Sequence, residues 1–201
     1  MSVRKNGIIT AALTSLVGGM MLASMPVWAG WKLDNQQSSI HFASVKNDSV
    51  FEQHGFRNLS GSIEDSGKVS LSIDLNSVDT QIQIRDERMK KELFDTKSYP
   101  ITQVSAAIDT AMLEKIAAGK TSTTTVEFEL DLHGKKQPLK AEVQVTGLDN
   151  GGLLVTTVEP VVITADAFGL ADGVNKLKDI AKLNSILMSV PVSANLVFVS
   201  E

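Results

Sequence analysis

Hydrophobic and polar residues alternate along most of the chain beyond position 38. Segments 69–76, 125–132 and 141–146 each place an apolar residue at every second position, with polar residues between them. Because successive side chains on a strand point to opposite faces, each segment predicts a half-buried β-strand. The longest alternation covers residues 185–200, which corresponds to about 50 Å of extended chain at roughly 3.3 Å per residue.

Three further segments also predict strands, with turns between them. Residues 39–45 alternate cleanly, and residues 153–164 form another apolar and polar run. Residues 50–63 are less regular and contain two glycines, which indicates one bent or bulged strand. The Asp-Asn-Gly-Gly sequence at 149–152 predicts a tight hairpin, because Asn-Gly accepts positive φ angles. A turn is also predicted at residues 134–136.

Helical periodicity is confined to short segments. Residues 81–93 predict an amphipathic helix capped by Asp79 or Thr80. Residues 173–183 predict a second helix, capped by the aspartate that precedes it, with apolar residues three positions apart. Residues 111–118 predict a short third helix that ends at a glycine.

These elements predict an all-β fold: an extended antiparallel β-barrel of about eight strands with two or three short helices. Closure into a barrel removes the exposed strand edges that invite aggregation. The length of the last strand indicates a barrel well over 30 Å tall at a tilt near 40°. A β-sandwich with a filled core is the alternative, because alternation predicts one buried face in either architecture.

The first 29 residues have a different character. Arg4 and Lys5 precede an uncharged run over residues 8–23, and the sequence Val-Trp-Ala at 27–29 places small residues before a cleavage point. This pattern is typical of a secretory signal peptide, so we expect a signal peptide over 1–29 and one domain over 30–201. A retained membrane anchor is the alternative, but the run is shorter than the roughly 20 residues that span a bilayer. Export to a bacterial periplasm follows as an expectation.

Charge and composition narrow the function. Two of the 19 basic residues and none of the 23 acidic ones lie in 1–29, so the remaining chain has a formal charge of −6. Such a surface repels phosphates, and we expect no nucleic-acid partner. The chain has no cysteine, which excludes thiol catalysis and thiolate metal sites.

No motif for catalysis or metal binding is present. His41, His54 and His133 are not spaced as metal ligands, and the sequence contains no Gly-x-Ser-x-Gly, phosphate loop or HExxH. We therefore expect a binding protein rather than an enzyme, with no metal site. Arg85 and Asp86 belong to the densest polar cluster. They fit a solvated helix face with local ion pairs or a contact to a ligand head group.

Four blocks of the sequence together resemble one known family. The block at 79–100 contains Asp-Thr, Arg-Asp, Phe-Asp and Tyr-Pro in order, and segments 31–42, 125–139 and 168–192 complete the pattern. The chain resembles the YceI-like polyisoprenoid-binding proteins over essentially all of residues 30–201. The resemblance implies a lipocalin-like barrel with a long apolar tunnel, a bound isoprenoid lipid or quinone, no covalent cofactor and a periplasmic location. It also implies that Arg85 and Asp86 are structural anchors that hold their helix segment against the barrel.

The resemblance turns the inner apolar faces into a candidate binding site, although the same alternation also fits a packed core. In addition, we expect the 81–93 helix to act as a lid, with Met89 as a pliable contact to the guest. The predicted tunnel residues are Phe42, Leu71, Ile73, Met89, Phe94, Val126, Phe128, Leu130, Val143, Val145, Met188, Val190, Val192 and Leu196.

The leading hypothesis is a periplasmic carrier whose partner is a long-chain isoprenoid. One alternative is a quinone-linked electron-transfer accessory that contacts a membrane or a membrane cytochrome. Another is a stress-induced protein that binds amphiphiles without specificity, and an enzyme acting on a lipid is the weakest. The sequence leaves the oligomeric state open, a homodimer included.

Overall fold

The computed structural model describes residues 30–113, 116 and 118–200. The predicted signal peptide over 1–29 lies outside the described residues. Among the residues described, no helix is long and apolar enough to cross a membrane.

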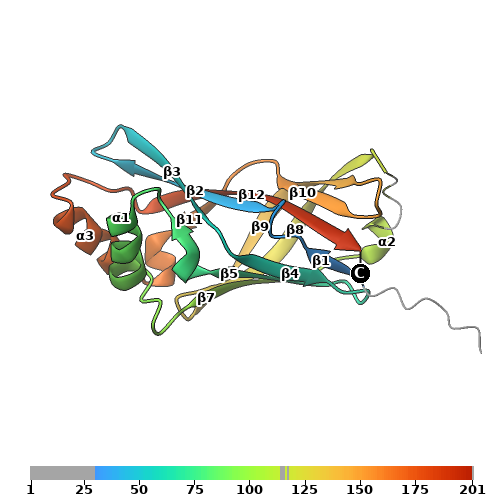
Figure 1. Cartoon of the computed structure of the whole chain (residues 1–201), viewed down its shortest axis with the longest axis horizontal. Helices are drawn as coiled ribbons and strands as arrows, with labels where there is room; N and C mark the ends of the chain where they lie inside the picture. Colours follow the sequence, from blue (N-terminus) through green and yellow to red (C-terminus); the bar gives the residue numbers. More distant parts are fainter. Residues whose placement is uncertain (1–29, 114–115, 117, 201) are drawn as a thin grey trace, which may run out of the picture.

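Eight antiparallel strands close into an elongated barrel, which confirms the predicted fold class (Figure 1). The barrel closes because the last strand pairs with the first, for example at Leu33 and Phe198. In their order around the barrel, the strands are β1 (Trp31–Leu33), β4 (Leu59–Ile63), β5 (Lys68–Asp74), β7 (Ile101–Ala107), β8 (Thr121–Leu132), β9 (Lys135–Gly147), β10 (Leu153–Thr157) and β12 (Ser189–Ser200).

Strand β12 pairs with four other strands, because two strands lie end to end along each of its edges. One edge pairs with β10 and then with β11 (Val161–Thr164). The other edge pairs with β1 and then with β2 (Ser39–Lys46). The predicted single strand over 153–164 is therefore wrong. It divides before Pro160, which has no N–H to donate to a sheet.

The predicted bent strand over 50–63 is likewise two strands, β3 (Val50–Phe56) and β4. Strand β3 pairs with β2, whereas β4 pairs with β1. The break at Arg57 and Asn58 is held by Ser77, whose carbonyl and hydroxyl oxygens accept hydrogen bonds from the two backbone N–H groups. The short strand β6 (Val78–Asp79) then pairs with the end of β3.

The turns lie where the sequence predicts them, except that one begins one residue earlier. The predicted hairpin at 149–152 is present, and Gly151 has a φ of 76°. The turn predicted at 134–136 lies one residue earlier, because Lys135 already begins β9. His133 and Gly134 have φ angles of 55° and 71°, the positive pair that a two-residue turn needs between twisted strands.

Most of the helical segments gather at one end of the barrel, with α2 (Thr110–Leu113) at the other (Figure 1). The predicted 81–93 helix is an α-helix followed by a π-helical turn. The elements at the first end are the 3₁₀ turn η1 (Leu75–Ser77), α1 (Gln83–Arg88), η2 (Met89–Leu93), the 3₁₀ turn η3 (Ala165–Phe168) and α3 (Ala171–Ile180).

Neither predicted cap performs that role. Helix α1 begins after Ile82, with no side-chain cap, because Asp79 accepts from Gln81 and Arg57 while the Thr80 hydroxyl bonds to Asp86. Helix α3 begins after Leu170, so the predicted capping aspartate lies inside its first turn.

Helix α3 lies very close to the π-helical turn. A Cβ added at Gly173 would lie 2.8 Å from the carbonyl oxygen of Glu92 and 2.9 Å from the Cα of Leu93. A glycine here therefore lets the two backbones touch.

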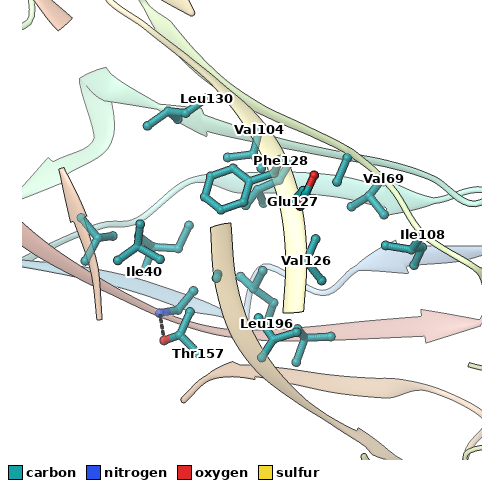
Figure 2. A pocket seen from close by; sticks show the side chains of 18 of the residues that line it. Ile40, Val69, Val104, Ile108, Val126, Glu127, Phe128, Leu130, Thr157 and Leu196 are labelled. Atoms are coloured by element: carbon teal, nitrogen blue, oxygen red, sulfur yellow. Dashed lines mark hydrogen bonds between the residues drawn. The ribbon is translucent and has the colours of Figure 1, made fainter. Parts of the chain in front are cut away.

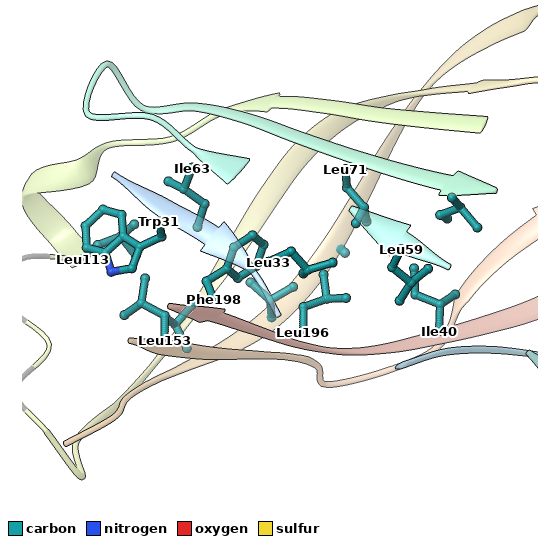
Figure 3. Close-up of a cluster of buried hydrophobic side chains, with 14 residues drawn as sticks. Trp31, Leu33, Ile40, Leu59, Ile63, Leu71, Leu113, Leu153, Leu196 and Phe198 are labelled. Carbon is teal, nitrogen blue, oxygen red and sulfur yellow. The ribbon is translucent and has the colours of Figure 1, made fainter. Parts of the chain in front are cut away.

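Two apolar clusters support the fold. One fills the barrel beside β1 and α2 and includes Trp31, Leu113 and Phe198 (Figure 3). The other lies beneath the helices and includes Leu75 and Phe168, each 1% exposed. Most residues of the first cluster, and some of the second, also line the candidate site.

Candidate ligand-binding cavity

The inner faces of the strands enclose an apolar cavity of about 590 Å³ (Figure 2). Strand alternation places the lining residues at every second position of most strands, as with Val69, Leu71 and Ile73 on β5. The volume lies within the usual range for small-molecule sites, which are mostly apolar. The barrel interior is thus hollow over this part and closely packed beneath the helices.

Most of the predicted tunnel residues lie together on this lining, although no ligand contact is tested. They come from five strands and from the residue that follows the π-helical turn. The predicted residues on the lining are Phe42, Leu71, Ile73, Phe94, Val126, Phe128, Leu130, Val143, Val145, Val192 and Leu196.

Three predicted tunnel residues lie off the lining. Met89 is 6% exposed and belongs to the apolar cluster under the helices, and Met188 packs against the same cluster. Val190 pairs with Ile163 in the half of β12 that extends towards the helical end. Val190 lies on the same face of β12 as the lining residue Val192, but this half of the strand extends beyond the cavity.

Several lining residues were missed. Val104 lies between Leu71 and Leu130 on the neighbouring strands, and Val155 lies opposite Val145. Cross-strand register was the missing signal, because it follows from pairing that the sequence does not specify. Ile108 and Met112 also line the cavity. Ile108 comes from the connection after β7 and Met112 from α2, so neither lies on a strand.

Aromatic rings close the end of the cavity nearest the helices. The ring centroids of Phe42 and Phe56 are 5.3 Å apart, and those of Phe56 and Phe94 are 6.1 Å apart. Both pairs are tilted, with interplanar angles of 33° and 50°, and their spacing is typical of aromatic contacts. Phe94 belongs to the packed cluster beneath the helices, and Phe42 and Phe56 pack against it, so the cavity ends at this cluster.

Few polar groups face the cavity. Among the described residues, the only charged side chains on the lining are Asp109 and Glu127. A hydrogen bond from Lys140, at 2.6 Å, lowers the pKa of Glu127 and keeps this carboxylate ionised. The hydroxyls of Thr102 and Thr157 are already paired with backbone groups.

Arg85 and Asp86 form an anchor beside the cavity, not a part of its wall. Nη1 of Arg85 donates to Glu52 and Nη2 donates to the carbonyl of Thr80, each at 2.7 Å. Asp86 is buried and accepts a hydrogen bond from the backbone N–H of Thr80 at 2.8 Å. Together these contacts hold the start of α1 against β3.

His54 is buried beside this anchor. Its Nε2 lies 3.1 Å from the Ser44 hydroxyl, and its ring packs on Phe42 with centroids 5.2 Å apart. Burial lowers the pKa of His54, and the charge of Arg85 lowers it further. Within the described part of the chain, no group of three or more histidine or acidic side chains could hold a metal ion.

A closed antiparallel barrel around an apolar cavity, with few polar groups inside, defines the class of small barrels that hold hydrophobic ligands. Within this class, residues 31–198 match the YceI-like domain. The chain therefore belongs to the YceI-like family, as its sequence blocks indicated.

Two solved structures have a fold similar to that of this chain. A polyisoprenoid binding domain from Saccharophagus degradans, implicated in plant cell wall breakdown, has 34% sequence identity and a TM-score of 0.84, covering 86% of this chain and 99% of that one. BcnA from Burkholderia cenocepacia has the same fold at 23% identity and a TM-score of 0.61, covering 82% of this chain and 98% of its own. No match was found among curated proteins.

Proposed function

We propose that this protein is a periplasmic carrier that holds an isoprenoid lipid or isoprenoid quinone inside the barrel. The observation that carries the proposal is the apolar cavity that runs between the strands, about 590 Å³ in volume. The 34% identity to a polyisoprenoid binding domain over 86% of the chain supports the ligand class.

The lining favours a guest without a charged group inside the barrel. The described lining residues include no lysine, arginine or histidine, and the two charged ones are both acidic. A buried diphosphate would have no cation to pair with, and unpaired buried charge is very costly. A quinone, alcohol or amide head group is therefore favoured over a diphosphate at any position within the cavity.

The hydrocarbon tail supplies the affinity. Burial of each CH₂ group contributes about 0.8 kcal/mol, so a guest of tens of carbons retains a large favourable term after the cost of ordering. Such binding depends on a continuous apolar lining more than on any one residue. Residues at the middle of the lining are thus the best places to obstruct it.

The first prediction tests the cavity with two substitutions on the same strand. Ala194 lines the cavity, whereas Val190, two alternations away on β12, does not. Ala194→Trp should occupy the cavity and abolish co-purification of the lipid, and Val190→Trp should leave it unchanged. Native mass spectrometry of both variants and the wild type, purified from a periplasmic extract, measures the bound mass directly.

The possible results separate the hypotheses. One bound species of defined mass in the wild type and in Val190→Trp supports the carrier. A ladder of unrelated masses would instead indicate a nonspecific amphiphile binder. Retention of the wild-type lipid by Ala194→Trp would contradict binding in the cavity. The protein mass in the same spectrum reports whether residues 1–29 are removed on export.

A further inference from the structure

One side of the barrel wall is interrupted near α2. Strand β7 pairs with β8 from Gln103 and Asp131 as far as Ala106 and Phe128. Beyond that pair, β8 continues to Thr121 and remains paired with β9 along its whole length. Among the described residues, the 121–127 stretch of β8 thus has a partner strand on one edge only.

The cavity reaches this unpaired edge. Elsewhere on the strands the lining residues alternate, but here the consecutive residues 106–109 and 124–127 all line it. Consecutive side chains on a strand point to opposite faces, so both can reach one cavity only where the sheet has an edge. We define the side slot as the gap between residues 106–112 and residues 124–127.

The solvent exposure of the inward residues on β8 and β9 agrees with an opening at the side slot. On β9 the inward residues Ala141, Val143 and Val145 are buried. On the facing part of β8, the inward residues Thr124 and Val126 are only half-buried. Water therefore reaches the inner face of β8 but not that of β9. Figure 2 shows Ile108 and Val126 beside the cavity.

The opposite end of the barrel is closed. The residues under the helices are almost fully buried, and the Arg85–Glu52 ion pair, at 2.7 Å, holds α1 in place. Met89 belongs to this packed cluster and not to the cavity. Residues 81–93, which the sequence suggested as a lid, thus contact this packed cluster and not the cavity.

The side chains at the rim of the side slot are held less firmly than those at the closed end of the barrel. Glu127 and its partner Lys140 lie on the solvent side, with side chains 73% and 69% exposed. Such an exposed ion pair contributes little stability. The other rim is the short helix α2, whose Met112 is an unbranched side chain that adapts to a passing chain.

Resting on the proposed function, we propose that the isoprenoid guest enters and leaves through the side slot between β7–α2 and β8. The tail passes between Ile108 and Val126 into the cavity. The polar head group stays at the slot, because its burial among apolar residues would leave it without hydrogen-bond partners.

Reversible cross-linking tests the slot directly, because the chain has no native cysteine. In the variant Ala107→Cys/Glu127→Cys, a short bis-methanethiosulfonate joins the two rims at the first position beyond the last β7–β8 pair. Both positions are exposed, so the substitutions should not disturb the core. The control is Ser105→Cys/Glu129→Cys, which links two residues that are already opposite each other in the sheet. Stopped-flow fluorescence follows uptake and release of geranylgeraniol labelled with nitrobenzoxadiazole.

We expect linking across the slot to slow both rates at least tenfold, and reduction of the linker to restore them. The control link should leave the rates unchanged. Unchanged rates in the slot-linked protein would overturn the slot, as would equal slowing by the control link. If the wild type itself takes up no probe, the proposed function fails, and the slot fails with it. If the wild type takes up the probe normally and the link has no effect on the rates, the slot proposal alone is wrong and the proposed function stands.

Discussion

At the scale of single residues, charge and location decide what the conspicuous side chains do. Arg85 occupies the most highly charged segment of the chain, yet its guanidinium donates hydrogen bonds to Glu52 and to the Thr80 carbonyl. Asp86 accepts a hydrogen bond from the backbone N–H of Thr80. Of the three roles that the sequence left open for this pair, the structural anchor accounts for all of these contacts.

Met89 provides a prediction at this scale. Because Met89 is 6% exposed within the cluster beneath the helices, its truncation should leave a cavity in packed apolar surroundings. Met89→Ala should lower the free energy of unfolding by about 2–5 kcal/mol. The release rate of a fluorescent isoprenoid should not change. Urea denaturation and stopped-flow release on the same variant test both parts, and a faster release with unchanged stability would reinstate the lid.

The sequence identified the inward face of most strands, and therefore most of the cavity lining. It did not separate Val190 from Val192, because both lie on one face of β12 and only the extent of the cavity distinguishes them. It also missed Ile108 and Met112, since their contact with the cavity depends on where the chain turns after β7. Face follows from local periodicity, whereas position along the cavity follows from tertiary packing.

At the scale of elements, the breaks between strands were the hardest features to predict. The β3–β4 break depends on Ser77, which is distant in sequence and accepts hydrogen bonds from Arg57 and Asn58. The hairpins were easier, because a positive φ angle requires particular residues at particular positions. The His133-Gly134 turn was nonetheless placed one residue too late.

Two turn glycines give a matched prediction at this scale. Gly134 and Gly151 both have positive φ angles, so Gly→Ala at either should cost about 1 kcal/mol in backbone strain. A Cβ at Gly151 meets no atom within 4 Å, whereas one at Gly134 lies 2.9 Å from the Tyr99 ring. Gly134→Ala should therefore cost about 1 kcal/mol more, because Tyr99 must leave its stack with His133. Equal losses in chemical denaturation of the two variants would contradict this account.

At the scale of the whole molecule, alternation alone could not distinguish a hollow barrel from a filled one. Both place the same residues inward, and the difference lies in how far apart the walls stand. Eight strands set that spacing, because barrel diameter grows with strand number. The family resemblance, rather than the periodicity, favoured the tunnel.

A hollow barrel should be stabilised by its guest, which gives a prediction for the whole molecule. A ligand at a hundred times its Kd adds about 2.7 kcal/mol to the free energy of unfolding. For a domain of this size, that is a rise in Tm of roughly 5–10 °C. Delipidated wild type should melt lower and recover with added geranylgeraniol, while Ala194→Trp should not respond. Circular dichroism melting curves measure this, and an unchanged Tm on delipidation would argue against a guest.

The place of β12 between four other strands also has a consequence for how the protein is made. Because β12 pairs with β1 and β2 on one side and β10 and β11 on the other, no barrel exists until β12 has been synthesised. A nascent chain that ends before β12 presents two long open edges, which are sites for aggregation. Such distant pairing also folds slowly. The growing chain thus needs protection from other strands until β12 closes the barrel, and only then does an interior exist for a lipid to occupy.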